Sequence, residues 1–442
     1  MSNGQSDALG GLTDTQATLE ASRCLMCEDP PCVAACPARV PVKHFIRALR
    51  FGCPRRAVNL IRQQNILAGV CGLACPVEEL CVGACTGTDL ATPVAIGKLQ
   101  HYAAVTEIRS GREGLAGPGD GRRVAIIGAG PSGLAAAAEL ARRGHLPTVF
   151  EKDRRPGGIC TYGAPADRVP QALLTGEIEY IKSLGVEIRT ASPIDRNNTI
   201  DDLIADGYQA VYVGTGLQRA ATPHVPGAEL EGVVTWRQLL HRASAFSLGE
   251  GDKPTVASQV IVVGGGGVAV DAACTALELG ADDVDVVCLE GPHEMPACRD
   301  EVDKAWQTGV RFHTRSMPIE VTGANGKVTG LNAIRIRWAE PGRFIPSNAD
   351  PIEGTEYWLP GATVVFAVGA APATELADAL PGVDVDVTGR IIADVDTGAT
   401  SRSGVYAGGD AVSGGGTTIV KAIAEGKRAG EAIDAHLRGM TG

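Results

Sequence analysis

Apolar residues in the middle of the chain fall into short runs that are separated by glycine turns. Residues 122–150 contain an apolar run, a glycine turn, an alanine-rich stretch and a second apolar run. This order predicts strand, turn, helix and strand, the βαβ unit of a parallel sheet. A second unit of the same kind begins at Val260. The two differ too much in sequence for a short-period repeat, so we expect two separate α/β domains.

The first 120 residues show a different pattern. Helical periodicity occurs at residues 42–51 and 95–109, and no series of strands accompanies it. Residues 110–121 are rich in glycine and contain a proline, a composition that does not support a regular element. The pattern predicts a helical domain that ends in a linker.

The last segment, from about residue 372, has no glycine turn that opens a sheet of its own. We expect it to return and complete the first α/β domain. The predicted fold class is therefore α/β, with an N-terminal α-helical domain followed by two Rossmann-like domains, the first of them discontinuous. The expected boundaries are 1–120, 121–232, 233–371 and 372–442.

Composition narrows the possible classes of function. The net charge of −11 over 442 residues argues against a nucleic-acid partner, which would need clustered Lys and Arg. The first residues lack the basic and apolar regions of a signal peptide, and we expect a cytoplasmic protein. The apolar stretch at 260–270 is interrupted by four glycines, so no membrane span is predicted.

Nine of the thirteen cysteines lie in the first 85 residues, and eight of these form two spaced groups. Thiolates separated by two to four residues can converge on one iron–sulfur cluster, so two groups predict two clusters. Zinc sites accept some of these spacings, and disulfides are a third reading that suits short secreted proteins better. The groups are Cys24, Cys27, Cys32 and Cys36, and then Cys71, Cys75, Cys81 and Cys85.

The first glycine turn has the features of a dinucleotide site. Gly128, Gly130 and Gly133 follow an apolar strand and precede the alanine-rich helix, which suits a pyrophosphate at the helix N-terminus. Glu151 ends the next predicted strand, where a carboxylate can bind ribose hydroxyls. Asp410, which follows a second apolar strand near the C-terminus, favours FAD as the ligand, although it could instead cap the helix predicted to start at Thr418.

The second turn contains Gly264, Gly266 and Ala269, an accepted variant of the same motif. The following strand, expected over 284–289, ends at Glu290. A carboxylate there binds a free ribose 2′-hydroxyl and repels a 2′-phosphate, so we favour NAD(H) over NADP(H). The alternative is that Glu290 faces solvent while Arg299 or Arg311 reaches a phosphate.

The segments CMCEDPPCVAACP, CGLACPVEELCVGAC, GGICTYGAPADRVP and AGGDAVSGGGTTIVKAIAEGK resemble the electron-input portion of the dihydropyrimidine dehydrogenases. The same architecture occurs in glutamate synthase small subunits and in the large subunits of ferredoxin-NADP transhydrogenases. The resemblance implies FAD, two 4Fe-4S clusters and NAD(H) as cofactors. It also implies that one cluster is held by Cys24, Cys27, Cys32 and Cys85, and the other by Cys36, Cys75, Cys81 and Gln100.

The choice of Gln100 as a ligand of the second cluster and the expected position of Cys160 both depend on this resemblance. Spacing alone would have nominated Cys71 in place of Gln100. Gln100 favours the dihydropyrimidine dehydrogenase branch, because the other branches more often have Glu there. The resemblance also places Cys160 near the flavin, whereas the remaining cysteines are expected to be packed thiols.

The function implied is that of an NADH-oxidising subunit, which passes electrons through FAD and the clusters to an FMN-containing barrel subunit that reduces uracil or thymine. The chain lacks that barrel, so we expect a hetero-oligomer. A glutamate synthase small subunit or a ferredoxin-NAD(P) oxidoreductase subunit is the alternative, and a structural scaffold is a third. No catalytic acid or base is expected. The candidate cofactor-binding residues are Gly128, Ala129, Gly130, Pro131, Ser132, Gly133, Glu151, Gly158, Ile159, Arg168, Gly409, Asp410, Thr417 and Thr418 for FAD, and Gly264, Gly265, Gly266, Gly267, Val268, Glu290 and Gly369 for the nicotinamide nucleotide.

Overall fold

The computed structural model describes residues 9–119, 121–373 and 375–439, so the ends of the first and last expected domains, 1–8 and 440–442, lie outside it. The chain forms two compact units, and each is described by itself. Unit 1 comprises Met1–Thr161, Ala166–Leu217 and Pro372–Gly442. Unit 2 comprises Tyr162–Pro165 and Gln218–Ala371, so the expected boundary at residue 233 falls within it.

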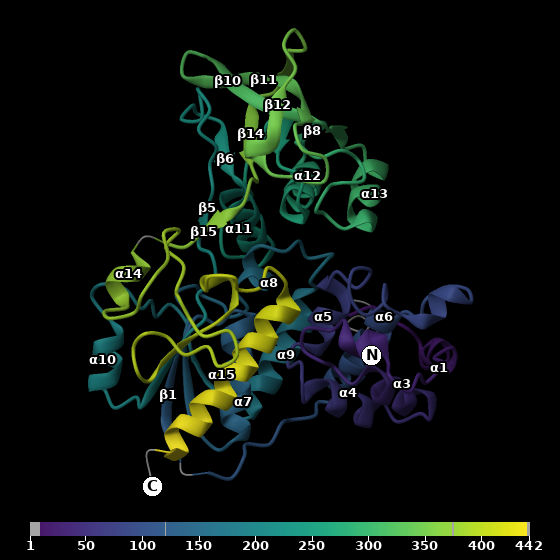
Figure 1. Ribbon diagram of the computed structural model, residues 1–442, viewed down its shortest axis with the longest axis vertical. Helices are drawn as coiled ribbons and strands as arrows, with labels where there is room; N and C mark the ends of the chain where they lie inside the picture. Colours follow the sequence, from purple (N-terminus) through teal and green to yellow (C-terminus); the bar gives the residue numbers. More distant parts are fainter. Residues whose placement is uncertain (1–8, 120, 374, 440–442) are drawn as a thin grey trace. The chain divides into compact units, whose positions relative to one another are not determined.

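The N-terminal part of unit 1 contains helices and, among its described residues, no strands, as the sequence predicts (Figure 1). Helices α5 and α6 cross closely because a glycine lies at the contact on each: a Cβ on Gly72 or on Gly97 would overlap the backbone of the other. The elements are α1 (Asp14–Ser22), α2 (Pro31–Ala34), α3 (Val42–Arg50), α4 (Pro54–Arg62), α5 (Ala68–Ala74), η1 (Thr86–Asp89) and α6 (Ile96–Arg109).

The rest of unit 1 is built on a five-stranded parallel sheet with the order β16-β4-β1-β2-β3. Strand β16 comes from the C-terminal segment, which confirms the predicted discontinuous domain. The strands are β1 (Arg123–Ile127), β2 (Leu146–Phe150), β3 (Glu187–Arg189), β4 (Ala210–Val213) and β16 (Val405–Ala407). The helices are α7 (Pro131–Arg142), α8 (Ile159–Tyr162), α9 (Gln171–Ser183), α10 (Ile200–Ala205), α14 (Leu376–Ala379), η3 (Gly409–Ala411) and α15 (Ile419–Gly439).

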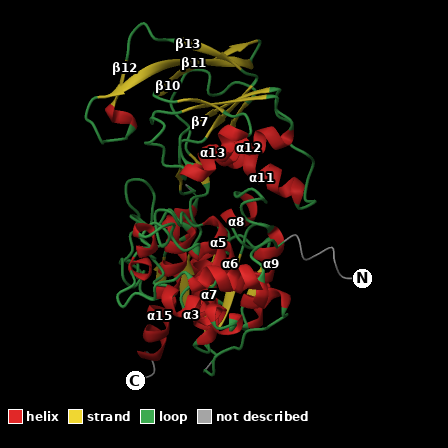
Figure 2. Ribbon diagram, turned by 90° about the vertical axis from the view of Figure 1, so that its right-hand side faces the viewer, coloured by secondary structure: helices red, strands yellow, loops and turns green. Residues whose placement is uncertain are grey.

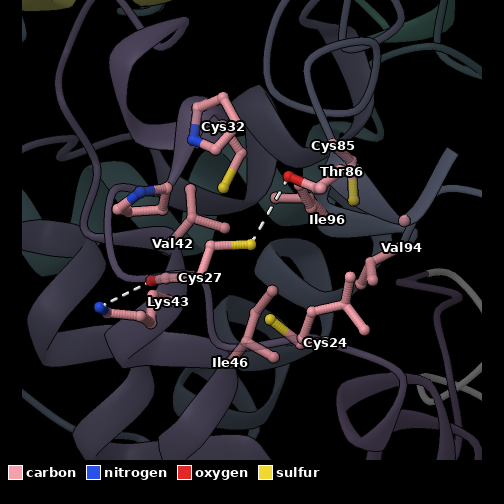
Figure 3. Close-up of a pocket in the computed structure, with 14 residues that line it drawn as sticks. Cys24, Cys27, Cys32, Val42, Lys43, Ile46, Cys85, Thr86, Val94 and Ile96 are labelled. Atoms are coloured by element: carbon pink, nitrogen blue, oxygen red, sulfur yellow. Dashed lines mark hydrogen bonds between the residues drawn. The ribbon is translucent and has the colours of Figure 1, made fainter. Parts of the chain in front are cut away.

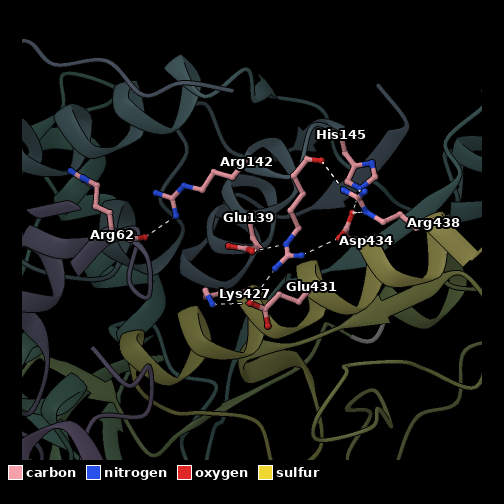
Figure 4. A network of polar contacts seen from close by, with 9 residues as sticks. Arg62, Glu139, Arg142, His145, Lys427, Glu431, Asp434 and Arg438 are labelled. Carbon is pink, nitrogen blue, oxygen red and sulfur yellow. Dashed lines mark hydrogen bonds and ion pairs between the residues drawn. The ribbon is translucent and has the colours of Figure 1, made fainter. Parts of the chain in front are cut away.

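Helix α15 packs along α7 and is fixed there by a network of charged side chains (Figure 4). Arg143 Nη1 lies 3.0 Å from Asp434 Oδ2, and Arg143 Nε lies 2.7 Å from Glu139 Oε1. Asp434 also pairs with His145 Nε2 at 2.9 Å and with Arg438 Nε at 2.7 Å. The C-terminal helix is thereby held against the helix that follows the first glycine turn.

Unit 2 has three layers, which Figure 2 shows with its helices on one face of the sheet that contains β7 and the longer strands on the other. The central parallel sheet has the order β6-β14-β7-β8-β9. Its strands are β6 (Val233–Thr235), β7 (Gln259–Val263), β8 (Asp283–Val287), β9 (Arg311–His313) and β14 (Thr363–Phe366). The helices are α11 (Trp236–Ser247), α12 (Gly267–Leu279) and α13 (Arg299–Gln307), and the outer strands are β10 (Ser316–Ala324), β11 (Lys327–Trp338), β12 (Ala349–Pro351) and β13 (Tyr357–Pro360).

The small elements of unit 2 and two boundaries complete the fold. Strands β5 (Arg219–Ala220) and β15 (Ala370–Ala371) pair, and η2 (Pro346–Asn348) precedes β12. Strand β8 ends at Val287, two residues before the predicted end, and beyond it Cys288 N donates to His313 O and Cys288 O accepts from Ser316 N. Among the described residues, no helix is both long and apolar enough to cross a bilayer.

Candidate redox cofactor sites

The four cysteines predicted to hold the first cluster line one cavity, although they come from distant parts of the sequence (Figure 3). Cys24 and Cys27 lie between α1 and α2, Cys32 lies in α2, and Cys85 lies just before η1. The remaining wall is largely apolar and includes Val42, Ile46, Val94 and Ile96.

These thiols are crowded in a way that suits a cationic iron cluster. Burial raises the pKa of Cys32 to about 11, and negative charge on Cys24 and Cys85 adds to the rise. Burial likewise raises the pKa of Cys24, with the charges of Cys27 and Cys85 adding to it. Four mutually repelling thiolates would be stabilised by iron, so the side chains present fit a 4Fe-4S cluster.

The second group of cysteines lies around α5. Burial raises the pKa of Cys81 to about 12, and the charge of Cys36 adds to this effect. Cys71 is 2% exposed, and after burial its main neighbour in raising its pKa is Cys75. The structure thus brings together Cys36, Cys71, Cys75 and Cys81.

Gln100, the rival to Cys71 as eighth ligand, lies on α6, which packs on α5. It is 8% exposed, and its Nε2 donates to Ala68 O at 2.8 Å. That bond leaves the amide oxygen as the atom able to bind iron. Cys71 therefore lies in α5, and Gln100 lies on the helix packed against it. The assignment of either residue as the eighth ligand stays a prediction.

A carboxylate that the sequence did not single out fixes the start of α5. Glu177 on α9 is fully buried and accepts hydrogen bonds from Gly69 N at 2.7 Å and Val70 N at 3.1 Å. Arg62 Nη2 lies 3.6 Å from Glu177, and Arg62 Nε lies 2.5 Å from Glu107. Charged residues on amphipathic helices usually face solvent, so the sequence did not predict this contact. The one sign of it is that Glu177 is spaced with the apolar residues on one face of α9.

None of the thirteen cysteines is in a disulfide. Within the described residues, no group of three or more His, Cys, Asp or Glu side chains has the arrangement of a single-ion site. Outside the two groups, the charges of Cys71 and Glu177 add to burial in raising the pKa of Cys160. Cys288 is also buried, Cys274 and Cys298 are partly buried, and Cys53 is exposed.

The first glycine turn forms an open cradle at the N-terminus of α7. Gly128 has a φ of +99°, and a Cβ there would lie 2.7 Å from Gly214 O, so only glycine fits. A Cβ on Gly130, in contrast, would meet no atom closer than 4.0 Å. The open second glycine and the helix N-terminus suit a pyrophosphate.

Glu151 lies beside this turn, as predicted. Glu151 is 5% exposed, and its carboxylate accepts hydrogen bonds from Ala129 N at 2.8 Å and Asp153 N at 2.9 Å. Burial nevertheless raises the pKa of Glu151. Across the turn, Gly158 packs so that a Cβ would lie 2.9 Å from Gly130 Cα. The residues present therefore fit a dinucleotide.

Asp410 lies in η3 rather than at the start of α15. Burial raises its pKa to about 6, and the charge of Glu425 adds to the rise. Glu425 Oε2 accepts from Gly409 N at 2.7 Å, a role that the sequence did not suggest. The alternative that Asp410 caps the helix is wrong, because the helix starts at Ile419 and the Thr418 hydroxyl accepts from Lys421 N at 3.4 Å.

The second glycine turn, in unit 2, repeats this geometry. Gly264 has a φ of +141°, and a Cβ there would overlap Ala367 O. A Cβ on Gly266 would be 3.9 Å from its nearest neighbour, Pro296 Cγ. Glu290 lies directly against the turn, because a Cβ on Gly265 would overlap the Glu290 carboxylate. Burial raises the pKa of Glu290.

The two arginines considered as alternative contacts to the nucleotide form ion pairs with aspartates. Arg311 Nη2 pairs with Asp285 at 2.8 Å, and Arg299 Nε pairs with Asp303 at 3.0 Å. The sequence did not single out Arg315, which pairs with Glu294, and Glu294 accepts from Gly291 N at 2.8 Å. Arg315 is therefore the cation tied most closely to the loop that follows Glu290.

The other predicted residues take up flanking positions. Ala129, Pro131, Ser132 and Gly133 continue the first turn into α7, and Gly267 and Val268 continue the second into α12. Ile159 is 42% exposed, Arg168 acts electrostatically on Cys160, and Thr417 is exposed before α15. Gly369 O accepts from Trp236 Nε1 at 3.1 Å, next to the β5–β15 pair.

Comparison with known proteins gives matches over both parts of the chain. Residues 2–112 match the family described as dihydropyrimidine dehydrogenase domain II, 4Fe-4S cluster, and residues 122–426 match the pyridine nucleotide-disulphide oxidoreductases. The glutamate synthase [NADPH] small chain of Escherichia coli is 33% identical over 95% of this chain and 91% of its own. The NAD-dependent dihydropyrimidine dehydrogenase subunit PreT of Escherichia coli is 33% identical over 97% of this chain and 96% of its own.

A third relative is longer, and solved structures share the fold. The NADP(+)-dependent formate dehydrogenase subunit beta of Moorella thermoacetica is 36% identical over 92% of this chain, which spans 60% of that protein. Mycobacterium tuberculosis FprA in complex with NADPH has a TM-score of 0.60 at 17% identity, covering 73% of this chain and 86% of FprA. Thioredoxin reductase of T. acidophilum has a TM-score of 0.52 at 20% identity, covering 72% and 99%.

Proposed function

Because this chain belongs to the pyridine nucleotide-disulphide oxidoreductases that carry an N-terminal 4Fe-4S domain of the dihydropyrimidine dehydrogenase type, we propose that it is the NADH-oxidising subunit of a larger enzyme. Its cofactors are FAD, 4Fe-4S clusters and a nicotinamide nucleotide. The partner proposed is an FMN-containing barrel that reduces uracil or thymine. The free thiols and the clusters call for a reducing compartment, and we place the protein in the cytoplasm.

One observation carries this proposal. The cavity lined by Cys24, Cys27, Cys32 and Cys85 lies in the same compact unit as the glycine turn at residues 128–133. A cluster site and a dinucleotide site in one unit suit transfer of electrons from one to the other. Bound FAD would accept a hydride from the nicotinamide and release the two electrons singly to the clusters.

The chain's own residues bind and orient in this scheme. The N-termini of α7 and α12 would hold the two pyrophosphates, and Glu151 and Glu290 would bind ribose hydroxyls. Asp410 would contact the ribityl or pyrophosphate part of FAD, and backbone N–H groups at Thr417 and Thr418 would stabilise negative charge on the flavin. Hydride transfer requires no acid or base from the protein, and none is assigned.

The glutamate synthase small chain supports a second candidate, because it is as similar to this chain as the dihydropyrimidine dehydrogenase subunit is. In that case the electrons would serve glutamate formation. Purified protein mixed with each candidate partner distinguishes the two: NADH-dependent reduction of uracil supports the first, and NADH-dependent glutamate formation from glutamine and 2-oxoglutarate supports the second.

The shared part of the proposal is tested on the isolated protein. Under anaerobic conditions, NADH should bleach the absorbance of a bound yellow flavin. Glu151→Arg should be purified with the cysteine domain folded but without the flavin, because the arginine removes the acceptor for Ala129 N at 2.8 Å. A wild-type protein that contains FAD that NADH does not bleach would contradict the proposal.

A further inference from the structure

A long stretch of the cysteine domain carries no negative charge. Between residues 30 and 77 there is no Asp or Glu, although the whole chain contains 51 acids and 40 bases. The same stretch contains seven Lys and Arg residues. The overall acidity of the chain therefore hides a basic segment, which includes α3 and α4.

Most of these cations point to solvent and have no acidic partner. Five of the seven are exposed, and among the described residues no ion pair engages any of them. Elsewhere in the structure exposed arginines form ion pairs, as Arg299, Arg311 and Arg343 do. A set of exposed like charges left unpaired within one segment suits an acidic partner. The five are Arg39, Arg47, Arg50, Arg55 and Arg56.

Helix α3 arranges this charge on one side. It buries Phe45, Ile46 and Leu49. Arg47 and Arg50 lie on the opposite, exposed side, and Phe51, the C-terminal cap of the helix, is 69% exposed beside them. An exposed aromatic ring among arginines has the composition of a protein interface, with an apolar anchor and a charged rim.

The same face borders the first cysteine cavity. Lys43 lines the cavity and donates to Cys27 O at 2.8 Å (Figure 3). Leu25, which also lines it, is 49% exposed. A protein bound to this face would lie against the wall of the first cluster site.

We propose that the exposed side of α3 with the start of α4, defined by Arg47, Arg50, Phe51, Arg55 and Arg56, is the docking face for the electron-accepting protein, which presents an acidic surface. The inference rests on the proposed function, since it assumes that electrons leave through the first cluster. Nucleic acid is the other polyanion that such a face could attract, but a protruding Phe51 beside a redox site favours a protein acceptor.

The test uses oxidised cytochrome b5, an acidic one-electron acceptor, as the probe with the complete, cofactor-loaded protein. The rate of its NADH-dependent reduction should fall steeply as NaCl is raised from 20 to 500 mM, because opposite charges steer the encounter. Basic cytochrome c, which carries charge of the opposite sign, should be reduced more slowly than cytochrome b5 at low salt. A reduction rate for cytochrome b5 that does not depend on salt would overturn the proposal.

Charge reversal locates the face. Arg47→Glu with Arg50→Glu should lower kcat/KM for cytochrome b5 about 10-fold to 100-fold at low salt. The matched control is Lys327→Glu with Arg343→Glu, two exposed cations in unit 2, which changes the net charge equally and should alter the rate less than about twofold. Arg47→Gln with Arg50→Gln provides a milder variant, with a smaller loss expected.

Stopped-flow reduction of the bound flavin by NADH distinguishes failure of the proposed function from failure of the docking face. It should be unchanged in every variant, since none of these residues lies at a glycine turn. Loss of flavin reduction in the wild type would contradict the proposed function. Normal flavin reduction with equal cytochrome b5 rates in both double variants would overturn only the docking face. Binding of a DNA duplex that only the α3 variant loses, with its cytochrome b5 rate intact, would also overturn it.

Discussion

Glu177 accepts a hydrogen bond of 2.7 Å from Gly69 N, 108 residues earlier in the sequence, and thereby joins α9 to the first turn of α5. The contact also brings a carboxylate to the positive end of a helix, where it is stabilised. Helix α5 carries Cys71 and ends next to Cys75. The position of these thiols therefore depends on a residue of the neighbouring domain.

Replacing Glu177 by Gln should lower the free energy of unfolding by about 1 to 3 kcal/mol, because an amide cannot accept both backbone N–H bonds and leaves Arg62 less neutralised. Urea denaturation measures the change. Glu179→Gln on the same helix is the control, since Glu179 pairs with Lys182 only at the surface and should change stability by less than about 0.5 kcal/mol. Equal effects of the two variants would contradict this role.

Iron content tests the cysteine assignments. Eight ligands for two 4Fe-4S clusters predict about eight irons per chain after anaerobic purification. Gln100→Ala should alter the electron paramagnetic resonance signal of one reduced cluster and leave the other, whereas Cys71→Ala should leave both. The reverse pattern would make Cys71, which the structure places beside Cys75 and Cys36, the eighth ligand. Two zincs and no iron would contradict both assignments.

Nucleotide preference should follow from Glu290. A partly buried carboxylate that faces a 2′-phosphate should cost about 2 to 4 kcal/mol, or roughly 30-fold to 700-fold in kcat/KM for NADH over NADPH. Flavin reduction measures the ratio, and Glu290→Arg should shrink it strongly. Glu320→Arg, on the exposed edge of β10, should leave it unchanged. Equal use of both nucleotides by the wild type would direct attention to Arg315, which pairs with Glu294 in the same loop.

The raised pKa of Asp410 predicts a pH dependence of stability. Its value is about 6 in the folded protein against 3.8 ordinarily, so the folded state holds a proton between these pH values that the unfolded state releases. Stability of the FAD-free protein should therefore fall as pH rises from 4 to 6. The full cost, at most about 3 kcal/mol, applies above pH 6.

Asp410→Asn removes this cost. The FAD-free variant should be more stable than wild type above pH 6, and the two should converge below pH 4, as thermal denaturation at each pH would show. Asp386→Asn is the control, because the pKa of Asp386, an exposed loop residue bonded to Thr388, is lowered rather than raised. A constant difference between wild type and Asp410→Asn across this range would show that Asp410 does not titrate as described.

Local signals in the sequence were sufficient for the elements that we propose bind anions. Apolar runs before the glycines of the two turns predicted β1 and β7, and the motif spacing predicted the helices that follow. The same holds for the return of the C-terminal segment, since an apolar strand without its own glycine turn needed another sheet to pair with. These features depend on neighbouring residues in the chain.

Contacts between distant residues could not be predicted in this way. Glu177, Glu425 and Arg315 are charged residues whose partners lie far away in the sequence or on another element. Glu177 is fully buried and Glu425 and Arg315 are partly buried, and a single sequence does not encode burial of a charge as it encodes an apolar period. The choice between Cys71 and Gln100 as the eighth ligand could not be predicted for the same reason, because it depends on how α6 packs on α5.

Because β16 is an edge strand that pairs with β4, unit 1 is completed only when the final segment of the chain has been synthesised. The cysteine domain leaves the ribosome as one continuous piece, whereas Asp410 and α15 emerge later. Cluster insertion can therefore precede flavin capture during biogenesis. A bound flavin then identifies molecules whose translation has passed Asp410 and α15, and a nonsense mutation before Val405 would yield chains that hold iron but no flavin.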